Sequence, residues 1–75
     1  MSKENKQVIL ERISKNIKKF RKVLGDPSIE ALSKTTKLSF QTFLNLKNNR
    51  SNSASISTLV EVANALKCNV VDLLH

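Results

Sequence analysis

The stretch SIEALSKTTKLSFQTFLNLKNN, residues 28–49, decides the fold. Ser28 and Ser39 each precede an apolar residue, where a serine oxygen can accept the free backbone N–H groups of a first helical turn. Apolar residues then recur three positions apart in each segment, as the core side of a short helix requires. The stretch therefore predicts two short helices, over about 29–36 and 40–48, joined by a tight turn.

Upstream of this stretch, a one-sided apolar stripe predicts a long amphipathic helix over about 7–24. Its members step by three and four residues, and they are Leu10, Ile13, Ile17, Phe20 and Leu24. Gly25 and Pro27 are the single glycine and proline of the chain, so the strongest backbone break falls here. We expect Gly25 to cap the end of the helix.

Downstream, Ser55 and Asn69 can each open a helix, over 56 to about 67 and over 70–74. Residues 51–55 form a polar loop, and no strand-like alternation competes with the helical patterns. We predict an all-α, compact five-helix single domain over residues 1–75, with residues 1–6 as a flexible arm. From the four short helices, the expected core residues are Ile29, Leu32, Phe43, Leu46, Leu59, Val60, Ala63, Leu66, Val70, Leu73 and Leu74.

Length and composition argue against an enzyme. A chain of 75 residues forms one small domain with a modest core, which leaves little room for a catalytic cavity. We find no pairing of nucleophile and base, no acid pair and no glycine-rich phosphate loop. Cys68 is the single cysteine, so no internal disulfide forms, and we expect its side chain in the core. We also expect no metal and no cofactor.

The N-terminal residues suggest a cytoplasmic protein. Residues 1–7 are polar and of mixed charge, with neither the apolar run of a signal peptide nor the length of a membrane span. We therefore expect no membrane association.

The positive charge is unevenly distributed along the chain. Residues 1–25 carry eight Lys and Arg against two acids, residues 26–50 four against two, and residues 51–75 one against two. The net charges of these thirds are +6, +2 and −1. A polyanion such as DNA needs charge gathered on one surface, which this asymmetry favours, although a solvated basic helix would give the same pattern.

The helix predicted over 40–48 presents amides on its exposed side. At about 100° per residue, Phe43 and Leu46 define a buried side. Gln41, Asn45 and Asn48 fall on the opposite side. An Asn or Gln side chain can pair with the N6 and N7 atoms of adenine in the major groove, and such a contact discriminates by about 1–3 kcal/mol. The residue pattern alone thus predicts a DNA-reading ridge.

The run from Ile29 to Asn49 resembles the helix-turn-helix of the phage Cro and repressor family. Residues 55–74 look like the family's fourth and fifth helices, where Ala-Leu, a short turn and a final Leu-Leu recur. Arg21, four residues before Gly25, matches an Arg common in the family's first helix. The resemblance covers most of the chain and implies a lambda-repressor-like domain that binds duplex DNA with its second and third helices.

This resemblance also suggests which residues contact DNA. By position, the family reads base edges at Phe40, Gln41, Leu44 and Asn45. Phe40 and Leu44 are apolar, so they could contact thymine methyl groups or complete the core instead. Phosphate contacts are expected from helix starts and from the loop after the third helix. The candidates are Ser28, Ser39, Thr42, Asn48, Arg50, Ser51 and Asn52.

Three residues depart from the family pattern. Lys37 occupies the usual position of a turn glycine, and a left-handed backbone there would cost about 1 kcal/mol. Ile29 replaces a frequent Gln that helps to hold a phosphate. Lys47 replaces an acid that often pairs with the first-helix Arg, so Arg21 needs another partner or faces solvent or DNA.

These observations lead us to expect a transcriptional regulator, a repressor that binds a palindromic operator as a homodimer. One helix reads only a few base pairs, too few to find one site among about 10⁶ competing positions. The near-neutral last third is least repelled by a second copy, and Val71, Leu73 and Leu74 offer apolar surface for the contact. In the family such dimers often form only on DNA. No small-molecule ligand is evident.

Two alternatives stay open. The same fold could belong to an antitoxin or another module whose main task is to bind a protein partner. The second alternative is a basic protein that binds RNA or a membrane surface. Against RNA, the chain has only three Phe and no Tyr or Trp on which bases could stack. The apolar stripe of the first helix is also needed by the core rather than by a membrane.

Overall fold

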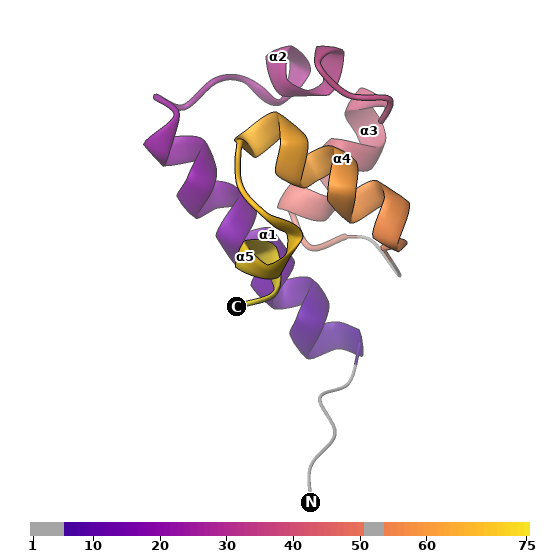
Figure 1. Cartoon of the computed structure of the whole chain (residues 1–75). Coiled ribbons are helices and arrows are strands. Elements are labelled where there is room, and N and C mark those ends of the chain that lie inside the picture. The colour runs from indigo at the N-terminus through magenta and orange to yellow at the C-terminus, as the bar shows by residue number, and fades with distance from the viewer. Residues whose placement is uncertain (1–5, 51–53) are drawn as a thin grey trace, which may run out of the picture.

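A computed structural model describes residues 6–50 and 54–75 of the chain (Figure 1). These residues form five helices and no strand: α1 Lys6–Val23, α2 Ile29–Lys34, α3 Phe40–Lys47, α4 Ile56–Leu66 and α5 Val70–Leu74. The predicted all-α, five-helix fold is confirmed. Lys6 begins α1 and so does not belong to the predicted N-terminal arm. Residues 1–5 of that arm and the phosphate candidates Ser51 and Asn52 lie outside the described residues.

Serine caps begin three of the helices, as predicted. The side-chain oxygens of Ser28, Ser39 and Ser55 accept the backbone N–H three residues later, at 3.0, 3.1 and 3.1 Å. Helix α5 begins differently, because the Asp72 carboxylate accepts the backbone N–H of Asn69 at 3.0 Å. These local bonds satisfy N–H groups that the helices cannot satisfy themselves.

Three helices end on a left-handed residue. Gly25, Asn49 and Lys67 follow α1, α3 and α4 with φ of 91°, 57° and 58°. The N–H group of the next residue bonds to the carbonyl five residues earlier, at 2.9, 2.7 and 3.0 Å. This is the Schellman motif, which satisfies the last carbonyls of a helix. The predicted cap at Gly25 is confirmed.

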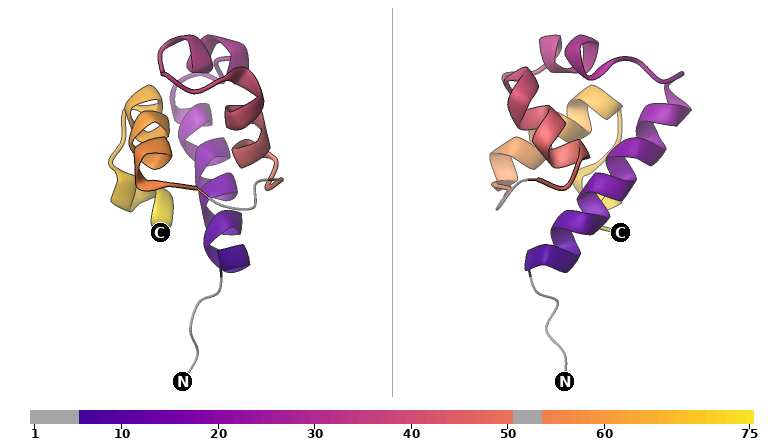
Figure 2. Two further views of the ribbon diagram at one scale, coloured as in Figure 1. Left: turned by 90° about the vertical axis from the view of Figure 1, so that its right-hand side faces the viewer. Right: turned by 180° about the vertical axis from the view of Figure 1, so that it is seen from behind.

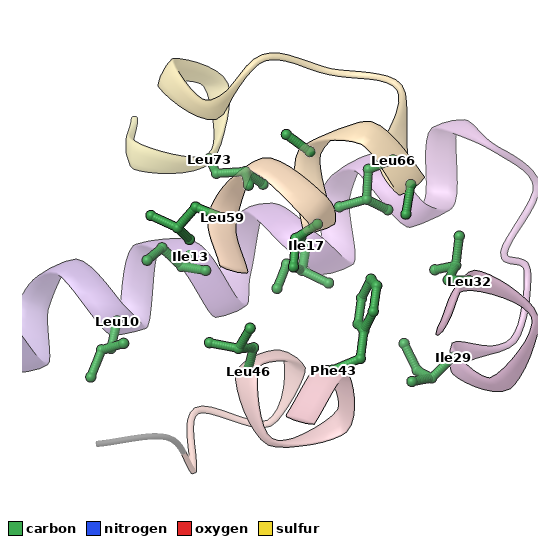
Figure 3. Close-up of a cluster of buried hydrophobic side chains, with 13 residues drawn as sticks. Leu10, Ile13, Ile17, Ile29, Leu32, Phe43, Leu46, Leu59, Leu66 and Leu73 are labelled. Atoms are coloured by element: carbon green, nitrogen blue, oxygen red, sulfur yellow. The ribbon is translucent and has the colours of Figure 1, made fainter. Parts of the chain in front are cut away.

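A single apolar core joins all five helices (Figure 3). Phe43 of α3 lies between the side chains of α1, α2 and α4, and none of its surface is exposed. Most predicted core residues are buried, but Val60 and Leu74 are 40% and 36% exposed, and Val62 is buried in place of Val60. Val62 follows Leu59 by three residues and so shares its face of α4, whereas Val60 lies beside that face.

Helix α1 lies between α3 and the two C-terminal helices, α4 and α5. It contacts α3, α4 and α5, and the left view of Figure 2 shows α3 at one edge of the molecule and α4 and α5 at the other. Two polar bonds fix this arrangement. The buried hydroxyl of Ser14 donates to the Lys47 carbonyl at the end of α3, and the Asn16 side chain donates to the Leu73 carbonyl at 2.8 Å. These bonds tie α1 to the end of α3 and to α5.

Candidate nucleic-acid interface

The turn between α2 and α3 is built from hydroxyl groups and one carboxylate. Thr36 Oγ1 donates to the Ser33 carbonyl at 3.0 Å and accepts the Leu38 N–H at 3.0 Å. The Lys37 N–H donates to Glu61 Oε1 of α4 at 3.2 Å. Lys37 is not left-handed. Lys37 therefore does not pay the cost of a left-handed backbone, which the glycine usual at this position in the family would avoid. The turn fixes α3 relative to α2 without a glycine.

Helix α3 buries one side and exposes the other. Phe43 and Leu46 are buried, while Phe40 is 46% exposed and Gln41 is exposed. Leu44 and Asn45 are half-buried, and Leu44 packs against the core. The four predicted base-reading residues thus share one accessible side of α3, but only part of the Leu44 side chain lies on that surface. Phe40 does not complete the core.

Gln41 and Asn45 are bonded to one another. Gln41 Nε2 donates to Asn45 Oδ1 at 2.9 Å, one helical turn away. This bond leaves the Gln41 carbonyl oxygen as an acceptor and the Asn45 amide nitrogen as a donor. The adenine edge in the major groove offers one donor and one acceptor, N6 and N7. The paired amides therefore present complementary groups in a fixed arrangement.

The predicted phosphate contacts differ in their free hydrogen-bonding groups. Ser39 accepts the Thr42 N–H and donates its own hydroxyl proton to Thr42 Oγ1 at 2.9 Å. The hydroxyl proton of Thr42 is therefore the one that could reach a phosphate, whereas Ser39 acts as a cap. Ser28 caps α2 through its oxygen and keeps its proton. Asn48 is half-buried and Arg50 is exposed, both at the end of α3.

Arg21 has a partner within the chain. Its Nε donates to the Pro27 carbonyl at 2.8 Å, so the side chain ties the end of α1 to the segment before α2. The expectation that Arg21 needs a partner other than Lys47 is confirmed. Lys47 is half-buried, and its carbonyl accepts the Ser14 hydroxyl.

Glu61 and Ser14 were missed by the sequence reasoning. Both support α3 from outside the helix-turn-helix, one through the preceding turn and the other through the last carbonyl. Glu61 lies 24 residues from its partner and Ser14 lies 33 residues from its own. Neither belongs to a local motif, so the sequence offered no signal for these contacts.

The predicted dimer residues need one correction. Val71 is 59% exposed and Leu74 is 36% exposed, but Leu73 has no exposed surface. Leu73 points into the core between α1 and α4, so it cannot contact a second copy, and its inclusion was wrong. Ile56 and Val60, at 69% and 40% exposed, add apolar surface on α4 beyond the predicted residues.

Cys68 is half-buried and packs against the core. Burial raises the pKa of its thiol, and the nearby Asp72 carboxylate raises it further. The thiol is thus neutral near pH 7, which suits a packing role.

Comparison with known proteins identifies the fold. The model for the Cro/C1-type HTH DNA-binding domain matches residues 16–75. No curated protein and no solved structure matches the chain. None of the described helices is long and apolar enough to cross a membrane. Since the match covers most of the chain, with the helix-turn-helix at α2 and α3, the protein belongs to the Cro/C1-type helix-turn-helix DNA-binding family.

Proposed function

We propose that this protein is a sequence-specific regulator of transcription, a repressor that binds a palindromic operator as a homodimer. One observation carries the proposal. Helix α3 buries Phe43 and Leu46 and leaves Phe40, Gln41 and part of Asn45 accessible to solvent. In this family α3 is the helix that enters the major groove, and we call it the recognition helix.

The chemistry of the outer face favours A·T base pairs. Paired amides suit the N6 and N7 atoms of adenine, and the exposed ring of Phe40 suits the C5-methyl group of thymine. No Lys or Arg lies among the four predicted base-reading residues, although Arg is the side chain that most often reads guanine. We therefore expect an operator half-site in which adenine and thymine dominate the contacted positions.

Repression and dimerisation follow from what such a domain can do on DNA. A protein that occupies a promoter can block transcription without any surface beyond its DNA-reading face. Eight residues of recognition helix contact only a few base pairs, so two copies on a palindrome supply the specificity that one lacks. Val71 and Leu74 remain exposed for the contact between copies.

Selection of bound duplexes from a random library, using the full chain, tests the proposal. We expect enrichment of an inverted repeat with A·T-rich half-sites. The Asn45→Ala variant should lose preference for that site by about 1–3 kcal/mol while keeping its affinity for random duplex. Arg50→Ala, a change at a phosphate-contact candidate, should weaken both duplexes alike. Recovery of no preferred sequence by the unaltered protein would contradict the proposed function.

A further inference from the structure

A basic hollow lies beside the recognition helix, between residues 8–18 of α1 and the end of α3. Its volume is about 490 Å³. Helix α1 contributes Arg12, Lys15 and Lys18 together with one carboxylate, Glu11, and the end of α3 contributes Asn48 and Asn49. We call this site the α1–α3 hollow. Three cations face one anion in it, so the hollow suits an anionic group.

The lysines of the hollow are available to a ligand. Lys15 and Lys18 are exposed, and within residues 6–50 and 54–75 no carboxylate forms an ion pair with either of them. Long cationic side chains that are not already paired can neutralise a phosphate without first breaking an internal bond.

The end of α3 does not repel an anion from the hollow. A helix C-terminus normally presents unsatisfied carbonyls with partial negative charge. Here the Lys47 carbonyl accepts the Ser14 hydroxyl. The carbonyls of Leu44, Asn45 and Leu46 accept the N–H groups of the next three residues after the helix, residues 48–50. With these carbonyls satisfied, the Asn48 and Asn49 side-chain amides can face the hollow as donors.

The hollow also lies where a phosphate track would pass. The recognition helix has eight residues, a length of about 12 Å. The major groove is about 12 Å wide, so a helix lying in it ends close to a groove edge, where the phosphates run. The α1–α3 hollow and Arg50 are both at that end of α3.

We propose that the α1–α3 hollow binds a backbone phosphate of duplex DNA, next to the phosphate contacted by Arg50, so that α1 forms a second phosphate-binding edge. This inference rests on the proposed function. It goes beyond the family match, which begins at residue 16 and leaves Arg12 and Lys15 outside it. Lys15 of α1 therefore adds a DNA contact that lies outside the residues matched by the family.

Two charge-matched double variants of the full chain test the proposal. Lys15→Gln with Lys18→Gln removes two charges from the hollow. Lys19→Gln with Lys67→Gln removes two exposed charges outside it, one beside the Phe20 ring and one after α4. Binding to the selected duplex and to a random duplex is measured over a range of salt concentrations. Circular dichroism melting checks that both variants fold.

The Lys15/Lys18 variant should weaken binding to both duplexes. It should also lower the slope of log affinity against log salt by about 0.9 for each phosphate that the variant no longer neutralises. The Lys19/Lys67 variant should keep the wild-type slope. On duplexes with single neutral methylphosphonate linkages, one linkage should weaken the wild type but not the Lys15/Lys18 variant.

Equal slopes for the two double variants would overturn the proposal. Binding of polyglutamate, a model acidic peptide, gives a second check. If the Lys15/Lys18 variant keeps its DNA affinity but no longer binds polyglutamate, the hollow is a site for acidic peptides and the proposal is overturned. In both cases a sequence preference that depends on Asn45 would leave the proposed function intact. Absence of any sequence preference in the wild type would instead remove the proposed function.

Discussion

Gln41 and Asn45 lie one turn apart on α3, and their side chains are bonded to one another. The bond of 2.9 Å between their amides restricts both side chains before DNA arrives. A restricted side chain loses less conformational entropy on binding than a free one. The helical pattern placed both residues on the exposed side of α3, but the bond depends on side-chain rotamers that the sequence does not reveal.

If the two amides read DNA together, their substitutions should not be additive. Asn45→Ala and Gln41→Ala should each cost about 1–3 kcal/mol of discrimination, and the double variant should cost clearly less than the sum. The reason is that each single change also frees the other amide from its partner. A double-mutant cycle on the selected and random duplexes measures the coupling. Full additivity would mean that the two residues contact separate bases independently.

The raised pKa of the Cys68 thiol leads to a second prediction at this scale. Burial is the larger cause and the Asp72 carboxylate the smaller. Since the thiolate is the reactive form, alkylation by iodoacetamide near pH 8 should be slower in the folded protein than in urea. Asp72→Asn removes one cause and should speed the folded-state reaction. Equal rates for the folded wild type and the unfolded chain would contradict this account.

The raised pKa of the thiol also predicts how the free energy of unfolding changes with pH. The folded protein holds the thiol proton to higher pH than the unfolded chain does. This contribution to the free energy of unfolding is therefore complete below the unfolded pKa of the thiol, and it is lost as pH rises toward the raised folded value. Alkaline titration of the wild type against Cys68→Ala isolates this effect.

At the scale of elements, helix starts were more predictable than helix ends. A serine cap acts on its own next turn, so Ser28, Ser39 and Ser55 mark the starts of α2, α3 and α4 in the sequence itself. The predicted end of α2 at residue 36 was too late, since the helix ends at Lys34. Thr35 and Thr36 each turn a hydroxyl back onto a carbonyl three residues earlier, which competes with continuing the helix.

The end of α4 offers a test of the capping argument. Lys67 has a left-handed backbone with φ of 58°, which costs a residue with a Cβ atom about 1 kcal/mol or more. Lys67→Gly should raise the free energy of unfolding by about 0.5–1 kcal/mol, because glycine adopts this conformation readily. Urea unfolding at equilibrium measures the change. Lys67→Ala, which keeps the Cβ atom, is the control, and an equal gain from it would point to charge rather than backbone.

At the scale of the whole molecule, the sequence predicted the class of fold and the accessible side of α3 more completely than the packing partners. Patterns of three and four residues identify one face of each helix, but α4 has apolar residues on several sides. The pattern alone could not choose between Val60 and Val62. The same difficulty put Leu73 and Leu74 among both the expected core residues and the dimer candidates. Only the packing of α5 against α1 and α4 decides which of its leucines is covered.

Long-range bonds connect α3 and the turn before it to the rest of the fold. Glu61 of α4 holds the turn before the recognition helix, and Ser14 of α1 holds the end of that helix. The positive charge is concentrated in α1, whereas residues 51–75, which include α4 and α5, have a net charge of −1. A second copy that contacts α4 and α5 therefore meets less repulsion than one that contacts α1.

That asymmetry leads to the prediction that two copies bind one operator through α5. Val71→Ser with Leu74→Ser should weaken binding to the complete palindrome and leave binding to an isolated half-site unchanged, because these changes disrupt only the interface between copies. Val23→Ser is the control, since Val23 is 76% exposed at the last residue of α1, whereas α5 is bonded to α1 at Asn16. Two recognition helices in such a dimer would lie about 34 Å apart, or about 10 base pairs between half-site centres. Sedimentation of protein–duplex mixtures gives the stoichiometry, and shifting the half-sites by about five base pairs, half a turn of the duplex, should abolish joint binding. A single protein on each selected site, with no loss of affinity when one half-site is scrambled, would rule out the dimer.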